Sequence, residues 1–382
     1  MLNQSTVKRI RLSIFSFFFL MGLCFSSWAS RIPDIKNFLH LDDASWGTVL
    51  LMIPLGQIVG MTLSGTLISK IGSKRVLLIS IIGYAISLIS IGMVRSEYML
   101  LVALVVFGFF ANFCNIAVNT QGVLLENYYK RPIMASFHGG WGLAGLLGGI
   151  MGLLMTALKI HPFFHFITIA TFITIGIIAN YKYLQPDKNP AKLETEGRNR
   201  PELFLFLLGI LGFFGMAAEG AMMDWCGVYL QNVVGIKDYL APLGLTAYMV
   251  TMALGRFVMD KATLKWGCRG VLQVCGLLIF AGLFIAVAYP NLIVTLIAFM
   301  IIGFGTCGIV PTVYSMVGQK TKISTGTALT IVSSISFLGF LLGPPLIGYI
   351  STATNLRYAY ALIGLFGLCI VGLSARLKVL KS

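Results

Sequence analysis

The chain has 382 residues, of which 57% are hydrophobic and 11% are charged, and its mean hydropathy is +0.89. Soluble domains carry about 25% charged residues, and one water-soluble core could not bury this much apolar surface. The net charge of +15 does not indicate nucleic-acid binding, because its distribution along the chain follows the polar segments between apolar runs. The composition therefore excludes a soluble globular protein and predicts an integral membrane protein.

Apolar segments of about 20 residues, the length of a membrane-spanning helix, recur along the whole chain. The alternation over about 10 residues that marks the strands of a membrane β-barrel is absent. Only helices and closed barrels satisfy every backbone polar group in lipid, so the sequence predicts an all-α membrane protein with twelve transmembrane helices in two pseudo-symmetric six-helix bundles. The predicted spans are residues 11–29, 45–68, 76–94, 98–120, 132–157, 162–183, 203–223, 242–260, 269–288, 292–317, 326–350 and 356–375.

The longest polar stretch lies in the middle of the chain, where Pro186 and Pro190 precede a group of charges. We interpret residues 185–202 as a cytoplasmic linker between an N-terminal six-helix bundle, residues 1–184, and a C-terminal six-helix bundle, residues 203–382. Lys and Arg concentrate in this linker, near both termini and in alternate loops. By the positive-inside rule, these loops and both termini are expected to be cytoplasmic.

A motif that follows the second span recurs after the eighth. Residues 65–75 read Gly-Thr-Leu-Ile-Ser-Lys-Ile-Gly-Ser-Lys-Arg, and residues 255–261 read Gly-Arg-Phe-Val-Met-Asp-Lys. With the twelve spans, the two copies resemble the loops patterned Gly-x-x-x-Asp-Lys/Arg-x-Gly-x-Lys/Arg of the Major Facilitator Superfamily. Ser69 replaces the usual Asp in the first copy, whereas Asp260 retains it in the second. Duplicated bundles build many secondary transporters, whose substrate site lies between the halves near the middle of the membrane.

The resemblance implies a secondary active transporter that works by alternating access and is not an enzyme. It also implies a cytoplasmic gate built from charged residues of the two loops, although ordinary positive-inside anchoring explains part of this charge. The expected gate residues are Lys70, Lys74, Arg75, Arg256, Asp260 and Lys261. Segments such as residues 27–33 and 137–141 are similar to a YbjJ-type branch of facilitators in the bacterial cytoplasmic (inner) membrane, and a fainter likeness to fucose:proton symporters favours a sugar-like solute.

Glu219 is a carboxylate inside the seventh apolar span, between Phe214 and Met222. Hydrocarbon penalises an unpaired ionised side chain heavily, so an intramembrane carboxylate is a functional candidate by default. Burial favours its neutral form, which would let Glu219 bind and release a proton during transport. Alternatively, Glu219 braces the bundle through an internal hydrogen bond. Asp224, near the outer end of the same span, is as consistent with a gate or surface role as with coupling.

The fourth span carries Asn112, Asn115 and Asn119 on one helical face. An amide is both a donor and an acceptor, which suits a neutral polyhydroxyl solute. Their other use in membranes is to hydrogen-bond neighbouring helices together. We therefore expect these residues either to line a substrate site or to fasten the bundle.

Aromatic and imidazole groups complete the candidate site. His138 and Trp141 lie one turn apart in the fifth span, where the histidine would shuttle a proton, or fill the core, and the indole would stack on a sugar ring. Trp28 ends the first span and would line the cavity or belong to an interfacial aromatic belt. Tyr248 and Tyr314 are further candidates for substrate contact.

These features predict a secondary transporter, coupled to protons, for a small polar, sugar-like solute. An exporter of amphiphilic or drug-like compounds and an uncoupled uniporter remain open alternatives. The sequence contains no nucleophile–base pair, no metal-ligand spacing and no phosphate-binding loop, so no enzymatic activity, cofactor or metal is expected. The expected partners are the solute, protons and the lipid bilayer, without nucleic acid, and the expected state is a monomer.

Overall fold

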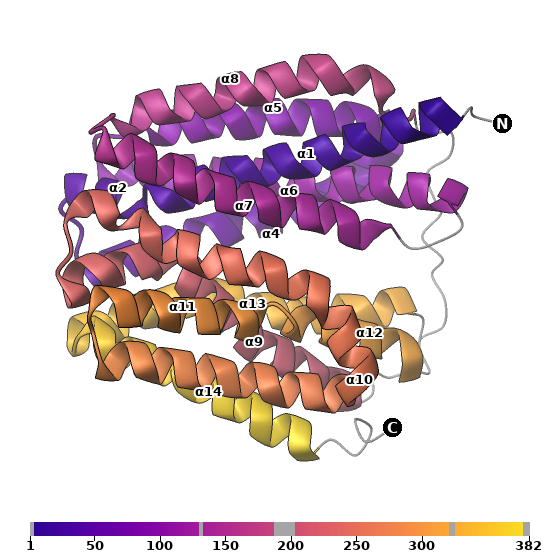
Figure 1. Ribbon diagram of the computed structural model, residues 1–382. Coiled ribbons are helices and arrows are strands. Elements are labelled where there is room, and N and C mark those ends of the chain that lie inside the picture. Colours follow the sequence, from indigo (N-terminus) through magenta and orange to yellow (C-terminus); the bar gives the residue numbers. More distant parts are fainter. Residues whose placement is uncertain (1–3, 130–132, 187–202, 321–324, 377–382) are drawn as a thin grey trace. The chain divides into compact units, whose positions relative to one another are not determined.

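The computed structural model describes residues 4–129, 133–186, 203–320 and 325–376, and all regular secondary structure in these ranges is helical (Figure 1). Among the described residues, 12 helical stretches are long and apolar enough to cross a membrane. The predicted fold class is therefore confirmed. These stretches are Ser5–Ser30, Asp43–Ile68, Ser73–Ile91, Glu97–Gly122, Ser136–Ala157, Pro162–Tyr183, Leu203–Val234, Asp238–Met259, Lys261–Ala288, Leu292–Tyr314, Ile331–Ala353 and Leu356–Arg376.

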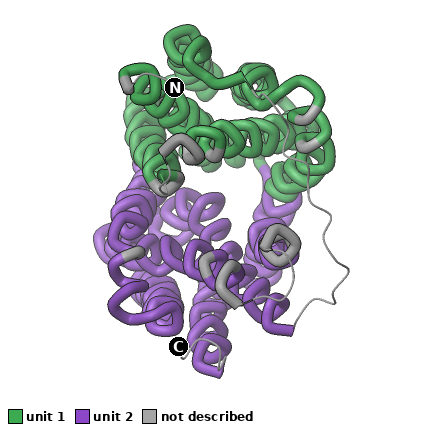
Figure 2. The backbone as a smooth tube through the Cα atoms, turned by 90° about the vertical axis from the view of Figure 1, so that its right-hand side faces the viewer, with its two compact units in different colours: residues 1–40, 49–192 green, residues 41–48, 193–382 purple. Residues whose placement is uncertain are grey.

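The chain divides into two compact units, which Figure 2 colours separately. Unit 1 comprises Met1–His40 and Val49–Lys192, and unit 2 comprises Leu41–Thr48 and Leu193–Ser382. Most of the predicted linker, residues 187–202, lies outside the described part of the chain. The boundary at residue 192 falls within this predicted linker.

Unit 1 is built by packing its helices in pairs. The helix α1 packs against α7, while α6 packs against both α4 and α5. Glycines allow the close approach of α4 and α6: a Cβ added to Gly56 would collide with the Val105 carbonyl oxygen, and one added to Gly108 would collide with that of Ile53. The helices of this unit are α1 (Gln4–Ser30), α2 (Ile32–Phe38), α4 (Met52–Ile71), α5 (Ser73–Ile91), α6 (Glu97–Tyr129), α7 (Met134–Ala157), α8 (Pro162–Asn180) and the 3₁₀ turn η1 (Tyr181–Tyr183).

Unit 2 repeats this scheme of paired helices. The helix α9 packs against α13, and α10 packs against α11 and α14. The long helix α10 contains most of the membrane span Asp238–Met259 and all of the span Lys261–Ala288, and its backbone breaks at Gly267, near the start of the second. The helices are α9 (Leu203–Tyr229), η2 (Leu230–Val234), η3 (Asp238–Leu240), α10 (Pro242–Ala288), α11 (Leu292–Thr306), α12 (Ile309–Lys320), α13 (Thr325–Ala353) and α14 (Leu356–Arg376), and α3 (Asp43–Leu50) contributes its first residues.

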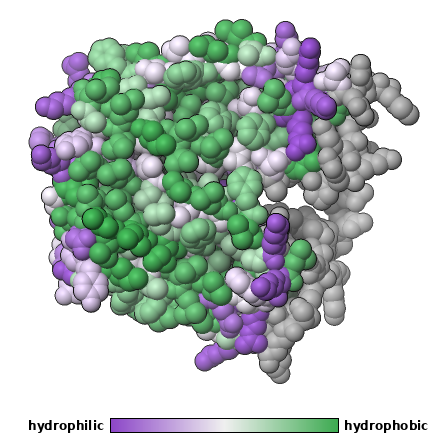
Figure 3. Space-filling view, in the orientation of Figure 1, coloured by the Kyte–Doolittle hydropathy of each residue, from purple (hydrophilic) through white to green (hydrophobic). Residues whose placement is uncertain are grey.

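The surface of the helices is apolar where lipid is expected. On the face drawn in Figure 3, hydrophobic residues cover the middle of the helices and hydrophilic residues gather near their ends. Large apolar side chains are exposed on several spans, among them Ile86 at 61% and Ile178 at 74%. In water, exposed apolar side chains of this kind would promote aggregation, whereas lipid acyl chains are as apolar as the side chains themselves.

The repeated motif turns the chain in the same way in both halves. Gly72, between α4 and α5, has φ 84° and ψ 151°, and Gly267, inside α10, has φ 69° and ψ 167°. This combination of angles is accessible essentially only to glycine. Gly72, in the first copy of the motif, and Gly267, six residues after the second copy, therefore have the same backbone role, and a side chain at either position would strain the backbone there.

The second span begins among residues of the other unit. Residues 41–48 cluster with unit 2, while the residues on either side of them belong to unit 1. Within unit 2, Ser351 Oγ donates a hydrogen bond to Asp43 Oδ2. The hydroxyl oxygens of Thr48 and Tyr349 lie 2.9 Å apart. The start of α3 is thus bonded to the end of α13.

We expect Gly267→Ala to lower the free energy of unfolding by about 1–3 kcal/mol, because the alanine would hold a strained backbone conformation. Nothing lies within 4 Å of the position of the new Cβ, so the effect isolates backbone strain from steric collision. Gly372→Ala, in the open and regular helix α14, is the matched control. It should be neutral or stabilising by up to about 1 kcal/mol. Thermal unfolding of the purified proteins in detergent measures both, and equal melting temperatures for the two variants would contradict the assignment.

Candidate transport site

An ion pair joins α9 to α10 inside unit 2. Glu219 Oε1 lies 3.8 Å from Arg256 Nη2, and the two side chains are 16% and 27% exposed. Both residues belong to membrane spans. The attraction between the two opposite charges offsets part of the free-energy cost of removing them from water, whereas either charge alone inside the membrane would be strongly disfavoured. From sequence, we assigned Glu219 to proton coupling and Arg256 to a gate, and the structure brings these residues together.

Two tyrosines of unit 2 complete this site. Tyr248, on α10, is fully buried, and its hydroxyl oxygen lies 2.8 Å from Thr306 Oγ1 on α11. Tyr314, on α12, is partly exposed. Both phenol groups lie within the electrostatic field of Glu219. We call Glu219, Arg256, Tyr248 and Tyr314 the charged cluster, to which α9, α10 and α12 contribute side chains.

The charged cluster responds to protonation by simple electrostatics. A proton on Glu219 cancels the negative charge, so the charge–charge attraction to Arg256 is lost. The neutral carboxyl group also becomes a hydrogen-bond donor. One proton therefore changes both the charge and the hydrogen-bonding capacity of this part of unit 2.

The amides of unit 1 line one face of α6, as their spacing predicts. Asn119 Nδ2 donates to both Asn115 Oδ1 and Asn115 O, each at 2.8 Å. Within the described part of the chain, Asn115 Nδ2 and Asn119 Oδ1 have no hydrogen-bond partner, which leaves one donor and one acceptor side by side. Asn112 Oδ1 is buried and accepts no hydrogen bond from the described residues. The Asn115–Asn119 pair is thus arranged to bond a hydroxyl group in both directions.

The side chains of His138 and Trp141, both on α7, are exposed to different extents. The His138 side chain is exposed and meets the Phe18 ring edge-on, with ring centroids 5.2 Å apart. The Trp141 ring is partly exposed, and its centroid lies 6.2 Å from that of the Phe25 ring. Both aromatic neighbours belong to α1, against which α7 packs.

Trp28 has a different position from the one expected of a solute contact. Its side chain is fully buried in unit 1, and its ring centroid lies 6.2 Å from that of Phe107 on α6. In this conformation the indole joins α1 to α6 and is out of reach of a solute. It also does not lie in an interfacial belt, because no part of it is exposed.

Lys74 and Gln121 fasten the start of the predicted linker to unit 1. Lys74 Nζ donates to the Leu184 carbonyl oxygen at 2.9 Å. Gln121 Nε2 donates to Ser73 Oγ at 2.7 Å and to the Gln185 carbonyl oxygen at 2.8 Å, while the Gln185 backbone N–H donates to Gln121 Oε1 at 2.9 Å. These contacts give Lys74 a second role besides the gate that the resemblance implies.

The other expected gate residues are exposed or have side chains outside the described part of the structure. Lys70, Arg75 and Lys261 are exposed. The Asp260 side chain lies outside the described part of the structure. The gate assignment of these residues stays a prediction.

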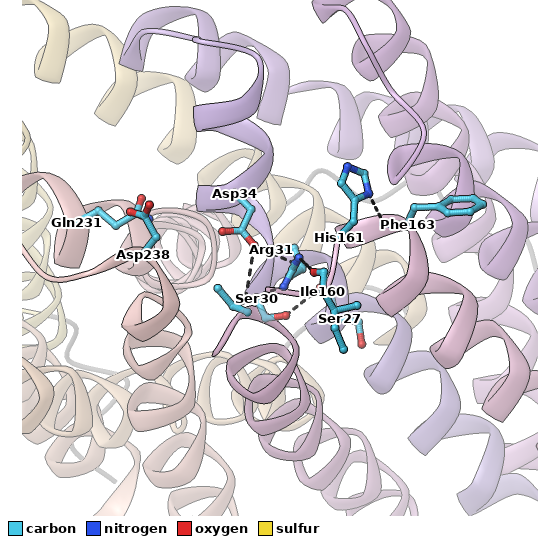
Figure 4. A network of polar contacts seen from close by, with 10 residues as sticks. Ser27, Ser30, Arg31, Asp34, Ile160, His161, Phe163, Gln231 and Asp238 are labelled. Atoms are coloured by element: carbon cyan, nitrogen blue, oxygen red, sulfur yellow. Dashed lines mark hydrogen bonds and ion pairs between the residues drawn. The ribbon is translucent and has the colours of Figure 1, made fainter. Parts of the chain in front are cut away.

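Arg31 organises a polar network in unit 1, at the end of α1, which was not predicted from the sequence. Arg31 is 2% exposed; its Nη1 donates to Thr156 Oγ1 at 2.6 Å and its Nη2 donates to the Ile160 carbonyl oxygen. Its Nε lies 2.9 Å from Asp34 Oδ2, and Figure 4 shows the guanidinium between Asp34 and Ile160. Burial lowers the pKa of Arg31, and the nearby Asp34 carboxylate opposes this shift.

Arg31 therefore connects α2 with α7 and with the turn before α8. The sequence signal was present: a basic residue follows an apolar span directly, and an acidic residue follows three positions later. What the sequence did not indicate is that this pair turns inward, toward Thr156, rather than outward to water.

Comparison with known proteins identifies the class to which this chain belongs. The profile of the Major Facilitator Superfamily matches residues 14–245 and 229–380. An uncharacterized MFS-type transporter of Yersinia pestis is 30% identical over 366 residues, which cover 94% of this chain and 93% of that protein. The uncharacterized transporter y4wD of Sinorhizobium fredii is 28% identical over 364 residues, covering 94% of this chain and 96% of the relative.

Among solved structures, a mutant of the nucleoside transporter NupG shares the fold with a TM-score of 0.79 and 14% sequence identity, covering 97% of this chain and 100% of that chain. Twelve apolar spans with polar side chains inside them define a multi-pass membrane transporter. The chain belongs to the Major Facilitator Superfamily. The finer likenesses, to the YbjJ-type branch and to fucose:proton symporters, stay predictions.

A double-mutant cycle tests the ion pair of the charged cluster. Arg256→Met should lower the melting temperature, because Glu219 loses its counter-ion inside a membrane span. Adding Glu219→Gln should recover part of that loss, with an interaction energy of about 0.5–3 kcal/mol. Arg75→Met removes an exposed arginine and is the matched control, for which adding Glu219→Gln should produce no interaction energy. Strict additivity in the Arg256→Met pair would contradict the contact.

Arg31→Lys should destabilise unit 1, because an ammonium group cannot reproduce the fork that reaches three partners. Losing one charge-assisted hydrogen bond lowers stability by about 1.5–3 kcal/mol. Arg95→Lys is the control, since Arg95 is exposed and should tolerate the change. Melting temperatures of the purified variants in detergent measure the difference, and an Arg31→Lys protein as stable as the Arg95→Lys protein would contradict the network.

Proposed function

We propose that this chain is a proton-coupled secondary active transporter of a small polar, sugar-like solute. It would work by alternating access in the bacterial cytoplasmic membrane, with both termini in the cytoplasm, as a monomer. The observation that carries the proposal is the charged cluster, in which Glu219 and Arg256 form an ion pair within the membrane spans of unit 2. An intramembrane ion pair of this kind is costly to bury, and such groups mark ion and substrate pathways.

In the proposed cycle, Glu219 binds a proton in one conformation and releases it in another. Protonation of Glu219 weakens the ion pair with Arg256 and changes the hydrogen-bonding capacity around Tyr314. The relative free energies of the two conformations therefore depend on whether Glu219 is protonated. A ligand shifts such an equilibrium only by its differential affinity for the two states. Proton and solute are coupled if both favour the same state.

The nature of the solute is inferred from the polar groups of unit 1. The Asn115–Asn119 pair offers a donor and an acceptor, and Trp141 offers an aromatic face that is partly exposed. Amide groups and an exposed aromatic face suit a neutral polyhydroxyl compound better than a large cation. Export of amphiphilic compounds and uncoupled uniport are the outcomes against which the proposal is tested.

The first experiment identifies the solute. Purified protein is screened by thermal shift against sugars, sugar derivatives, amino acids and cationic amphiphiles, because a compound that binds the folded state raises the melting temperature. The proposal expects a sugar or sugar derivative to give the largest shift, and Asn115→Ala to abolish it. A response confined to cationic amphiphiles would overturn the assignment of the solute in favour of the exporter.

The second experiment tests coupling with the compound that the screen finds. Proteoliposomes that contain a pH-sensitive dye report proton movement during solute uptake. We expect Glu219→Gln to abolish accumulation driven by a pH gradient but to retain exchange of labelled for unlabelled solute, because the neutral amide cannot cycle a proton. Glu97→Gln, at the start of α6, is the control that should retain both activities. If pH-driven accumulation survives Glu219→Gln, or if the wild type moves no protons, coupling through Glu219 is wrong.

A further inference from the structure

Asp224 is a second carboxylate inside unit 2, and it differs from Glu219 in having no counter-ion. It lies on α9 within the span Leu203–Val234 and is 6% exposed. In the part of the chain that the structure describes, Asp224 forms no ion pair and accepts no hydrogen bond. The neighbouring Trp225 is fully buried, and its Nε1 has no hydrogen-bond partner among the described residues.

The groups near Asp224 are neutral. Tyr360, on α14, donates a hydrogen bond from its hydroxyl to the Ala221 carbonyl oxygen at 3.4 Å, one turn before Asp224 on the same helical face. Tyr360 and the Cys226 thiol lie within the electrostatic field of Asp224. The Tyr229 ring stacks on Tyr360, with centroids 4.4 Å apart, and its hydroxyl donates to the Ala286 carbonyl oxygen.

Several charged and titratable groups of the surrounding helices have other neighbours among the described residues. Arg256, on α10, lies at Glu219, and Tyr248 and Tyr314 also lie in the field of Glu219. On α13, the Tyr349 hydroxyl contacts Thr48. At the start of α14, Arg357 Nη2 donates to the Val287 carbonyl oxygen at 2.6 Å, and the charge of Arg357 acts on Tyr229. Among the described residues of α11 and η2, none is charged.

A buried carboxylate ion without a partner is strongly disfavoured, and such a group becomes neutral by binding a proton. Glu219 and Asp224 are five residues apart on one helix, which separates them by about 7.5 Å along the axis and by about 140° around it. They have different neighbours: Glu219 lies beside a cation, whereas the Tyr360 hydroxyl is bonded one turn before Asp224 on the same helical face. Two carboxyl groups in such opposite environments take different protonation states at the same pH.

We infer that Asp224 is a second proton-binding residue of unit 2, and that it holds its proton in this conformation while Glu219 is ionised beside Arg256. The importance of Asp224 for transport rests on the proposed proton coupling. The protonation state itself does not, because it follows from burial and from the neighbours of Asp224. In a coupled cycle, α9 would then carry two carboxyl groups that are protonated in turn.

Infrared spectroscopy of the purified full-length protein at pH 7 tests this inference without any solute. A protonated carboxyl group has a C=O stretching band that an ionised carboxylate lacks. Exposed aspartates have a pKa of about 3.9 and are ionised at this pH. We expect one protonated carboxyl band in the wild type that shifts when the protein is made with ¹³C-labelled aspartate. Absence of an aspartate-derived band from the wild type at pH 7 would overturn the inference.

Variants assign the band to one residue. Asp224→Asn should remove it, and Glu219→Gln and Asp238→Asn should leave it unchanged, since Asp238 is exposed. Loss of the band in Asp238→Asn together with its retention in Asp224→Asn would also overturn the inference. The measurement on isotope-labelled wild type keeps the test decisive if Asp224→Asn does not fold. Because no gradient or transport is involved, a failure of this test and a failure of proton-coupled uptake are separate results.

Discussion

Every charged side chain that enters the lipid-spanning part of this protein needs either a partner or a proton. Lipid offers no water to solvate an ion, so the choice is decided by what the neighbouring helices supply. Glu219 receives Arg256 from α10, and Arg31, buried just beyond the end of the first span, receives Asp34 together with acceptors from α7 and from the turn before α8. Asp224 receives neither, which is why a bound proton is the remaining way to keep it inside unit 2.

The polar groups around α9 and α10 in unit 2 differ in kind from those on one face of α6 in unit 1. In unit 2 the polar groups inside the helices are titratable: carboxyl, guanidinium and phenol groups gather around α9 and α10. In unit 1 the candidate solute contacts on α6 are amides, whose hydrogen-bonding capacity does not change with pH.

The sequence predicted what depends on local length and composition. In the described part of the chain, twelve spans follow from twelve apolar segments, whereas the backbone angles of Gly72 and Gly267 are known only from the structure. The pairing of Glu219 with Arg256 could not be predicted, because it depends on how two helices rotate and tilt against each other. The inward turn of Arg31 and the burial of Trp28 escaped prediction for the same reason: hydropathy places a residue along the membrane normal but not around the helix.

The assignment of residues 41–48 to unit 2 changes how the covalent chain connects the two halves. The polypeptide passes from one unit to the other after residue 40, again after residue 48, and finally after residue 192. A protease that cut only the central segment would leave the halves joined by two further connections, one before α3 and one inside it. Any rearrangement between the halves must therefore be absorbed at three points of the backbone, two of which lie within ten residues of each other.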